Sequence, residues 1–234
     1  MNDSTASHPR REIRSFVKRA GRLTQSQARA LQELWPRYGA TRPEGTFDFT
    51  ALFERDAPVH LEIGFGMGDT LAEMAANAPE VNFLGIEVHE PGVGRLLNLI
   101  EERGLTNLRV MQDDAAEVLR NHIAPASLAA MYLFFPDPWH KKKHHKRRLV
   151  QPAFVELLAE RLQPEGLFHM ATDWEDYALW ARDVLEDCDY LDNAVRPGAF
   201  ADKPAWRPET KFERRGQRLG HGTWDLLYRR NNKA

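Results

Sequence analysis

Acidic side chains lie at the ends of four consecutive predicted strands in this 234-residue chain, at Glu62, Glu87, Asp114 and Asp137. Because the carboxyl ends of parallel strands meet at one edge of a sheet, we expect these carboxylates to line one crevice, the usual ligand position in such folds. Four carboxylates close together raise one another's pKa unless a ligand supplies positive charge or hydrogen-bond donors. The acids therefore predict a ligand that is cationic or rich in hydroxyl and amino groups. Asp113, beside Asp114, is interpreted as a loop acid that faces water.

A glycine-rich turn follows the first predicted strand, with Gly64, Gly66 and Gly68 in the segment EIGFGMG. Glycine allows a tight turn and a close approach to a ligand, and an acid at the end of the next strand, here Glu87, can accept hydrogen bonds from a ribose diol. Such a turn is a weak signal when it stands alone. S-adenosylmethionine carries a sulfonium, an ammonium, a ribose diol and an adenine amino group, whereas a dinucleotide carries two phosphates. The acids therefore favour S-adenosylmethionine as the cofactor.

The run from Met131 to Phe135 is apolar and aromatic, as in a buried strand, and it ends at a Pro-Asp-Pro turn around Asp137. Two prolines cannot continue a strand ladder, and they stiffen the turn that carries the acid. Trp139 then offers a flat face on which a base could stack. Cationic side chains follow at Lys141, Lys142, Lys143, Lys146, Arg147 and Arg148. Each feature alone is common in loops, but their adjacency predicts a site where a nucleobase meets an acid while phosphates are bound nearby.

Strand-like and helix-like segments alternate along most of the chain, which predicts an α/β fold with a mostly parallel sheet and helices on both faces. The predicted strands are residues 59–63, 82–87, 108–111, 128–135 and 166–171. The predicted helices are residues 70–78, 92–103, 115–121, 151–162 and 174–185. Before them, Thr24 and Gln27 form a capping-box pattern that opens a helix, which we expect Pro36 and Gly39 to end.

Composition predicts a globular cytoplasmic protein. Hydrophobic residues make up 42% of the chain, and the formal net charge is −2, so any nucleic-acid surface must be a local patch. The single cysteine, Cys188, excludes a disulfide within the chain, and no apolar stretch reaches membrane-spanning length. We expect no signal peptide, no membrane partner and no metal. Residues 1–45 are interpreted as a basic N-terminal arm and helix, and residues 46–234 as the main domain.

The ordered motifs of the chain resemble those of a known family. EIGFGMG, GIE, FPDPWHKKKH, ATD and TKFE are similar to motifs of the bacterial tRNA (guanine-N7-)-methyltransferases, and they begin at Glu62, Gly85, Phe135, Ala171 and Thr210. Two N-terminal pieces, RSFV from Arg14 and GRLT from Gly21, also look like that family. The resemblance covers nearly the whole chain, and the Pro-Asp-Pro-Trp block with its basic tail is its most specific part.

The resemblance implies a Rossmann-like methyltransferase fold that uses S-adenosylmethionine to methylate N7 of the guanosine at position 46, in the variable loop of tRNA. It implies a catalytic role for Asp137. Its donor-binding positions match Glu62, Glu87, Asp114 and Asp137, beside the loop glycines Gly64, Gly66 and Gly68. Its substrate-contact positions match Lys141, Asp173, Thr210, Lys211, Phe212 and Glu213. Its RNA-contact run matches Lys143, His144, His145, Lys146, Arg147 and Arg148. Asp173 is also interpreted as an N-cap of the helix that follows it.

Three other functions stay open from the residues themselves. An amino-group methyltransferase that acts on nucleic acid or protein also has a proline-flanked polar residue after its fourth strand, but the order Pro-Asp-Pro-Trp argues against it. A nicotinamide oxidoreductase would share the glycine turn. A non-catalytic RNA-binding module would leave the four strand-end acids unexplained. The oligomeric state, monomer or homodimer, also stays open.

Overall fold

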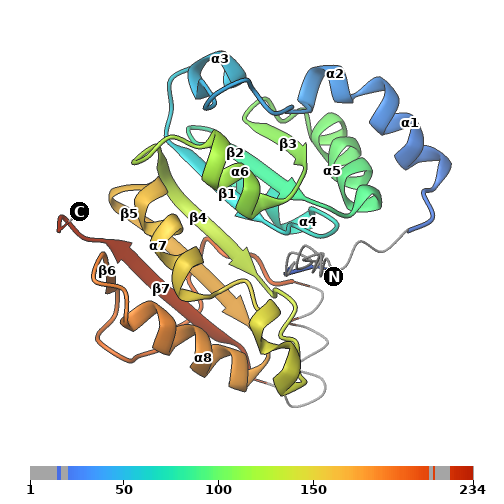
Figure 1. The fold of residues 1–234 in the computed structure, drawn as a ribbon. Helices are drawn as coiled ribbons and strands as arrows, with labels where there is room; N and C mark the ends of the chain where they lie inside the picture. The colour runs from blue at the N-terminus through green and yellow to red at the C-terminus, as the bar shows by residue number, and fades with distance from the viewer. Residues whose placement is uncertain (1–14, 17–20, 211–212, 214–221, 234) are drawn as a thin grey trace, which may run out of the picture.

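The computed structural model describes residues 15–16, 21–210, 213 and 222–233, and in them the predicted alternation builds a seven-stranded sheet (Figure 1). The strand order is β3-β2-β1-β4-β5-β7-β6. The strands are β1 (Val59–Ile63), β2 (Asn82–Glu87), β3 (Leu108–Gln112), β4 (Leu128–Phe134), β5 (Leu162–Thr172), β6 (Leu191–Asn193) and β7 (Trp224–Arg230). Strands β1 to β5 pair in parallel, which confirms the predicted α/β class, and β7 pairs antiparallel with both β5 and β6.

Helices cover both faces of the sheet because its strands are apolar on both sides. Alternate strand residues divide between two core clusters: Leu61 and Met131 belong to one, and Phe83 and Tyr132 belong to the other. The first cluster takes in α3 (Phe49–Phe53), α6 (Ala115–His122), α7 (Pro152–Arg161) and α8 (Glu175–Glu186). The second takes in α1 (Gln25–Glu33), α2 (Trp35–Tyr38), α4 (Asp69–Asn77) and α5 (Glu90–Arg103).

The C-terminal half departs from the predicted boundaries. Strand β5 begins at Leu162, four residues earlier than predicted, because α7 already ends at Arg161. Strands β6 and β7 were not predicted. They form an antiparallel edge on the parallel sheet, where β7 pairs with β5 and β6 pairs with β7, and neither strand has a strong local pattern.

The N-terminal helices dock on the main domain. The predicted capping box is present, since the Gln27 backbone N–H donates to Thr24 Oγ1 at 3.2 Å and the Thr24 N–H donates to Gln27 Oε1 at 2.9 Å. Pro36 does not end α1 as predicted: it lies in the first turn of α2, where its missing N–H costs nothing. Ala30 and Tyr38 are buried in the same cluster as α4 and α5, so the boundary at residue 45 does not separate two cores. Among the described helices, none has the length and apolar character needed to cross a membrane.

Candidate active site

A cleft of about 240 Å³ opens at the carboxyl ends of the central strands. Strand β1 lies between β2 and β4, so the chain leaves β1 toward one half of the sheet and reaches the other half through β4. Ligands of such sheets bind where the strand order reverses. Among the residues around the cleft are Gly64, Glu87, Asp114 and Asp137, from the loops and ends of four different strands. The structure therefore brings together four of the predicted site residues.

The glycine turn has the backbone that its sequence predicts. Gly64, Gly66 and Gly68 have φ values of 70°, 59° and 79°, in the left-handed region that favours glycine. A Cβ at Gly64 or Gly66 would have no heavy atom within 4 Å, so the turn presents bare backbone to open space. On its other side the turn is packed tightly, because a Cβ at Gly92 in α5 would lie 2.0 Å from the Gly66 carbonyl oxygen.

Glu87 braces this turn as well as lining the cleft. One carboxylate oxygen accepts a hydrogen bond of 2.9 Å from the Gly66 N–H, and the other accepts bonds of 2.7 and 2.9 Å from the Val88 and His89 N–H groups. These three donors fix the direction of the carboxylate at the end of β2. A ribose diol at the cleft wall would then meet an acceptor whose position is already set.

Glu62 is a buried acid with an unsatisfied carboxylate oxygen. Its side chain is 3% exposed, and its Oε2 atom has no hydrogen-bond partner among the described residues. Burial, followed by the charge of Glu87, raises the pKa of Glu62 from 4.5 to about 8. Buried carboxylates are normally hydrogen-bonded or paired. Glu62 therefore suits a ligand that brings a cation, such as an ammonium, to the first residues of the glycine turn.

The two aspartates after β3 have separate partners. Asp114 caps α6, since its Oδ1 accepts the Ala116 N–H at 3.0 Å, and it also lines the cleft. Asp113 does not face water as predicted: it forms a two-pronged pair with the Arg42 guanidinium. Burial would raise the pKa of Asp113, but the hydrogen bonds from Arg42 outweigh it and lower that pKa. Asp113 is therefore held as an anion by the segment that leads out of α2.

The Pro-Asp-Pro turn is held from both ends. Phe135 and Trp139 have φ values of 51° and 49°, which are costly for large side chains and which occur mainly at functional sites. The Phe135 N–H donates to the Ala171 carbonyl at 2.8 Å, and Arg148 Nε donates to the Pro138 carbonyl at 2.9 Å. These contacts fix Asp137 on the cleft wall, as its place in the sequence predicts.

A short N-terminal stretch completes the cleft. Ser15 and Phe16 line it, and their carbonyls accept hydrogen bonds from Trp139 Nε1 at 3.1 Å and Arg147 Nη2 at 3.2 Å. The Arg147 guanidinium carbon lies 3.9 Å above the Trp139 ring. One face of the ring is thus covered, which leaves at most the other for the predicted base stacking. The RSFV motif was the only sequence signal for this contact, and motif order alone could not place it in the cleft.

The basic run divides into exposed and buried cations. It forms a short 3-10 helix, η1 (Lys142–Arg147). The exposed ammonium groups belong to Lys141, Lys142, Lys143 and Lys146. The predicted RNA contact by Arg148 is wrong, because its side chain is 1% exposed and pairs with Asp176. The same guanidinium bonds to Pro138 and lies 4.9 Å from the Tyr177 ring, so it holds the Asp137 turn instead. His144 and His145 are half-buried.

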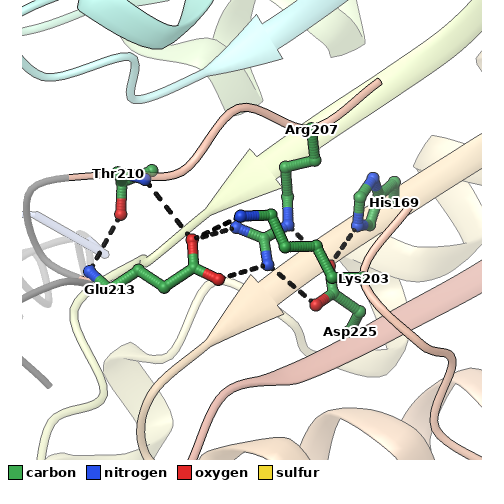
Figure 2. A network of polar contacts seen from close by, with 6 residues as sticks. All are labelled: His169, Lys203, Arg207, Thr210, Glu213 and Asp225. Carbon is green, nitrogen blue, oxygen red and sulfur yellow. Dashed lines mark hydrogen bonds and ion pairs between the residues drawn. The ribbon is translucent and has the colours of Figure 1, made fainter. Parts of the chain in front are cut away.

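The predicted substrate-contact residues also divide. Asp173 lies half-buried after β5, but it does not cap α8 as predicted, since the cap position is Trp174, whose N–H donates to Thr172 Oγ1. Glu213 is 3% exposed and its carboxylate accepts hydrogen bonds from Arg207 and Lys203, while its contact with the substrate stays a prediction (Figure 2). Lys211 and Phe212 lie outside the described residues. Sequence reasoning missed Arg207, because no local pattern marks a buried arginine.

Comparison with known proteins identifies a consistent set of relatives. A family model described as "Putative methyltransferase" matches residues 56–226. A tRNA (guanine-N(7)-)-methyltransferase of Alcanivorax borkumensis is 57% identical over 93% of this chain and 91% of its own length. The protein of that name from Pseudomonas aeruginosa is 53% identical over 97% of this chain and 95% of its own. Among solved structures, the 16S rRNA methyltransferase KamB has a TM-score of 0.59 at 16% identity, over 83% of this chain and 99% of its own, which shows a shared fold.

Proposed function

This chain belongs to the tRNA (guanine-N7-)-methyltransferase family, and from that premise we propose that it transfers a methyl group from S-adenosylmethionine to N7 of a guanosine in tRNA. The family resemblance favours the guanosine at position 46 in the variable loop as the target, and the cytoplasm as the place of action. The observation that carries the proposal is the convergence of Glu87, Asp114 and Asp137 on one cleft. The buried Glu62, whose Oε2 atom has no hydrogen-bond partner among the described residues, directly precedes Ile63 and Gly64, which also line the cleft.

The residues of the cleft fit the methyl donor. S-adenosylmethionine supplies an electrophilic methyl group on a sulfonium. Glu62 would accept hydrogen bonds from its ammonium, and Glu87 from its ribose hydroxyls. The bare backbone at Gly64 and Gly66 allows close approach, because no Cβ stands between the turn and the ligand. Asp114 and Asp137 would complete the acidic lining opposite a cation.

Asp137 lines the cleft and is assigned the contact with the target guanine. Guanine N7 carries a lone pair and no proton, so the reaction needs no general base. A carboxylate at Asp137 can accept hydrogen bonds from the guanine N1–H and N2 amino groups, which selects guanine among the bases. Those bonds strengthen as the ring becomes cationic, and preorganised groups of this kind stabilise the charge that develops in a transition state. Asp137 would therefore orient the base and stabilise charge rather than remove a proton.

The surface beside the cleft supplies contacts for the RNA. The ammonium groups of Lys141, Lys142, Lys143 and Lys146 are exposed on η1 and its N-terminal flank, directly after the Asp137 turn. Phosphates bound there would offset the cost of a few kcal/mol for taking a nucleotide out of its stacked or tertiary contacts. Recognition by phosphate position and RNA shape is expected to outweigh base sequence.

The test is single-turnover methyl transfer to tRNA with labelled S-adenosylmethionine, followed by identification of the modified nucleoside. The wild type should form N7-methylguanosine. Asp137→Asn and Asp137→Ala should lower the single-turnover rate by roughly 10²–10³-fold while tRNA affinity changes little. The exposed Asp189→Asn serves as the matched control.

Because N7 has no proton to lose, the wild-type rate should stay nearly flat with pH from neutral to mildly alkaline. Methylation of an exocyclic amino group instead of N7 would establish the amino-group alternative. A near-normal rate in Asp137→Ala would remove the assigned role of the acid, and a steep rise in rate above neutrality would indicate a general base.

A further inference from the structure

A buried polar network joins the loop before β7 to the sheet (Figure 2). At its centre is the Arg207 guanidinium, which is fully enclosed and lies between two carboxylates. Toward β7 its Nε and Nη2 atoms donate to Asp225 at 2.7 and 2.9 Å. Toward the loop its Nη1 and Nη2 atoms donate to Glu213 at 2.8 and 3.0 Å. The arginine thus makes two forked contacts, one to the sheet and one to the loop.

The sheet end of the network is held by several hydrogen bonds to Asp225. Asp225 also accepts a hydrogen bond of 2.6 Å from His169 Nε2 on β5, and its backbone carbonyl accepts the Ala201 N–H at 2.8 Å. Burial lowers the pKa of His169, which favours the neutral imidazole as the donor. Burial would raise the pKa of Asp225, but the hydrogen bonds from His169 and Arg207 lower it. Asp225 is therefore an anion fixed by two neighbouring strands.

The loop end of the network closes a turn at Thr210. The Glu213 N–H donates to Thr210 Oγ1 at 3.0 Å, and the Thr210 N–H donates back to Glu213 Oε2 at 3.3 Å. The same carboxylate receives Lys203 Nζ at 3.4 Å and the fork from Arg207. The position of the Thr210 turn therefore depends on Glu213, and the position of Glu213 depends on Arg207.

The network lies against the wall of the cleft. The Arg207 guanidinium carbon is 5.8 Å from the centre of the Phe135 ring, and the His169 ring is 5.0 Å from the Phe134 ring. Both phenylalanines line the cleft that contains Asp137. Trp206, next to the arginine in sequence, is 49% exposed, so this part of the loop also meets solvent. The loop is thus attached to the sheet directly behind the wall that carries Asp137.

Stability alone is a poor explanation for this arrangement. Buried ion pairs lose much of their Coulomb energy to desolvation, and apolar side chains of similar size often stabilise a fold as well. A guanidinium held by two carboxylates differs from an apolar contact in its direction, because each fork defines a plane and a distance. The arrangement therefore suits a loop that must be held in one defined position, and not merely packed against the sheet.

We propose that Arg207 is a positioning residue: by bridging Asp225 and Glu213, it sets the position of the Thr210 turn relative to the Phe135 wall of the cleft in which the target guanosine of tRNA is held. The inference rests on the proposed function of the cleft. It assigns Glu213 to the support of that turn rather than to contact with the substrate. It also brings Asp225 and His169, on the far side of Arg207, into the support of the reaction.

The experiment compares Arg207→Lys and Asp225→Asn with the wild type. Lysine keeps the positive charge but cannot fork to two carboxylates, so charge alone should not restore the position of the turn. Arg161→Lys is the matched control, because Arg161 is a buried arginine whose Nε donates to the Leu119 carbonyl, away from the cleft. Four quantities are measured: the folded fraction, the affinity for S-adenosylmethionine, the kcat and KM for tRNA, and amide hydrogen exchange over residues 201–210.

We expect Arg207→Lys to lower kcat by roughly 10²-fold, the size expected for a misplaced substrate, while donor affinity and KM for tRNA stay within about twofold. Exchange over residues 201–210 should accelerate without tRNA present, and Arg161→Lys should show neither effect. Wild-type kcat in Arg207→Lys after correction for the folded fraction, or unchanged exchange in the loop, would overturn the inference. If the wild type itself transfers no methyl group to tRNA, the proposed function fails, whereas failure of the inference alone leaves wild-type transfer intact.

Discussion

At the scale of single residues, the protonation state of Glu62 affects both the stability of the folded protein and its binding of a cationic ligand. Burial raises the pKa of its carboxyl from 4.5 to about 8 in the folded protein. The folded state therefore keeps a proton that the unfolded state releases as the pH rises above 4.5. Because the folded state binds more protons in this window, stability from this group is present below pH 4.5 and falls as the pH rises toward about 8. A cationic ligand would reverse that loss by pairing with the ionised form.

Glu62→Gln should remove this dependence. We expect the unfolding free energy of the ligand-free wild type to fall by up to about 1.4 kcal/mol per pH unit from this one group, and the variant to lack that contribution. The variant should also bind S-adenosylmethionine at least about tenfold more weakly, since a hydrogen bond to a charged group is lost. Urea unfolding at several pH values, with the exposed Glu102→Gln as the control, measures the first effect. Equal slopes for wild type and Glu62→Gln would show that Glu62 is ionised in the free protein.

At the scale of elements, η1 uses neighbouring cations for different purposes. Its lysines extend into solvent beside the cleft, whereas Arg147 stacks on Trp139 and Arg148, just after the helix, is buried under the Asp137 turn. A run of basic residues therefore combines an electrostatic surface with the support of the turn that it follows.

This division can be measured by salt dependence. Replacing Lys143 and Lys146 by alanine should flatten the log–log slope of tRNA affinity against salt by about 1–2. The variant would make fewer phosphate contacts, so fewer counterions would be released from the tRNA on binding. Arg148→Ala should leave that slope unchanged and instead lower the unfolding free energy by about 1–3 kcal/mol, since the half-buried Pro138 carbonyl loses its donor. A slope change for Arg148→Ala equal to that of the lysine variant would return Arg148 to the RNA-binding surface.

At the scale of the whole molecule, the N-terminal helices and the sheet share one core. Helix α1 lies against α5, where a Cβ at Gly94 would come within 2.8 Å of the Gln27 carbonyl oxygen. The Ala40 N–H donates to Val110 in β3 at 2.7 Å, so the chain is also joined to the sheet edge after α2. A disturbance at this contact should therefore be felt by the whole domain rather than by α1 alone.

Gly94→Ala tests whether the contact between α1 and α5 contributes to the stability of the whole domain. Alanine is favoured over glycine in a helix by about 1 kcal/mol, so an isolated α5 would become more stable. In the folded protein the added methyl group would collide with the backbone of α1, and we expect the melting temperature to fall in one cooperative transition. Gly45→Ala, where a Cβ would meet nothing within 4 Å, is the control. A rise in melting temperature for Gly94→Ala would mean that the contact between α1 and α5 is loose.

The sequence by itself determined the features that depend on local chemistry. Apolar runs predicted the parallel strands because both faces of a central strand are buried, and strand-end acids marked the cleft because parallel strands end at one edge. The capping box at Thr24, the left-handed glycines and the stiff turn at Asp137 follow from the backbone preferences of single residues. The structure confirms the parallel strands, the capping box and the glycine turn, and three of the four strand-end acids, Glu87, Asp114 and Asp137, line the cleft.

The tertiary structure alone decided which polar side chains turn inward. Nothing local distinguishes Arg148 from Lys146, or Glu213 from an exposed acid, because burial depends on partners that arrive from distant segments. Arg148 meets Asp176 from α8, Glu213 meets Arg207, and Trp139 bonds to Ser15 from 124 residues earlier in the chain. The same holds for β6 and β7, because β7 pairs with β5 and β6 pairs with β7, in each case with a strand from a distant part of the chain. Periodicity and motifs indicate the structural preferences of a single segment. These contacts depend instead on how two distant segments pack against each other.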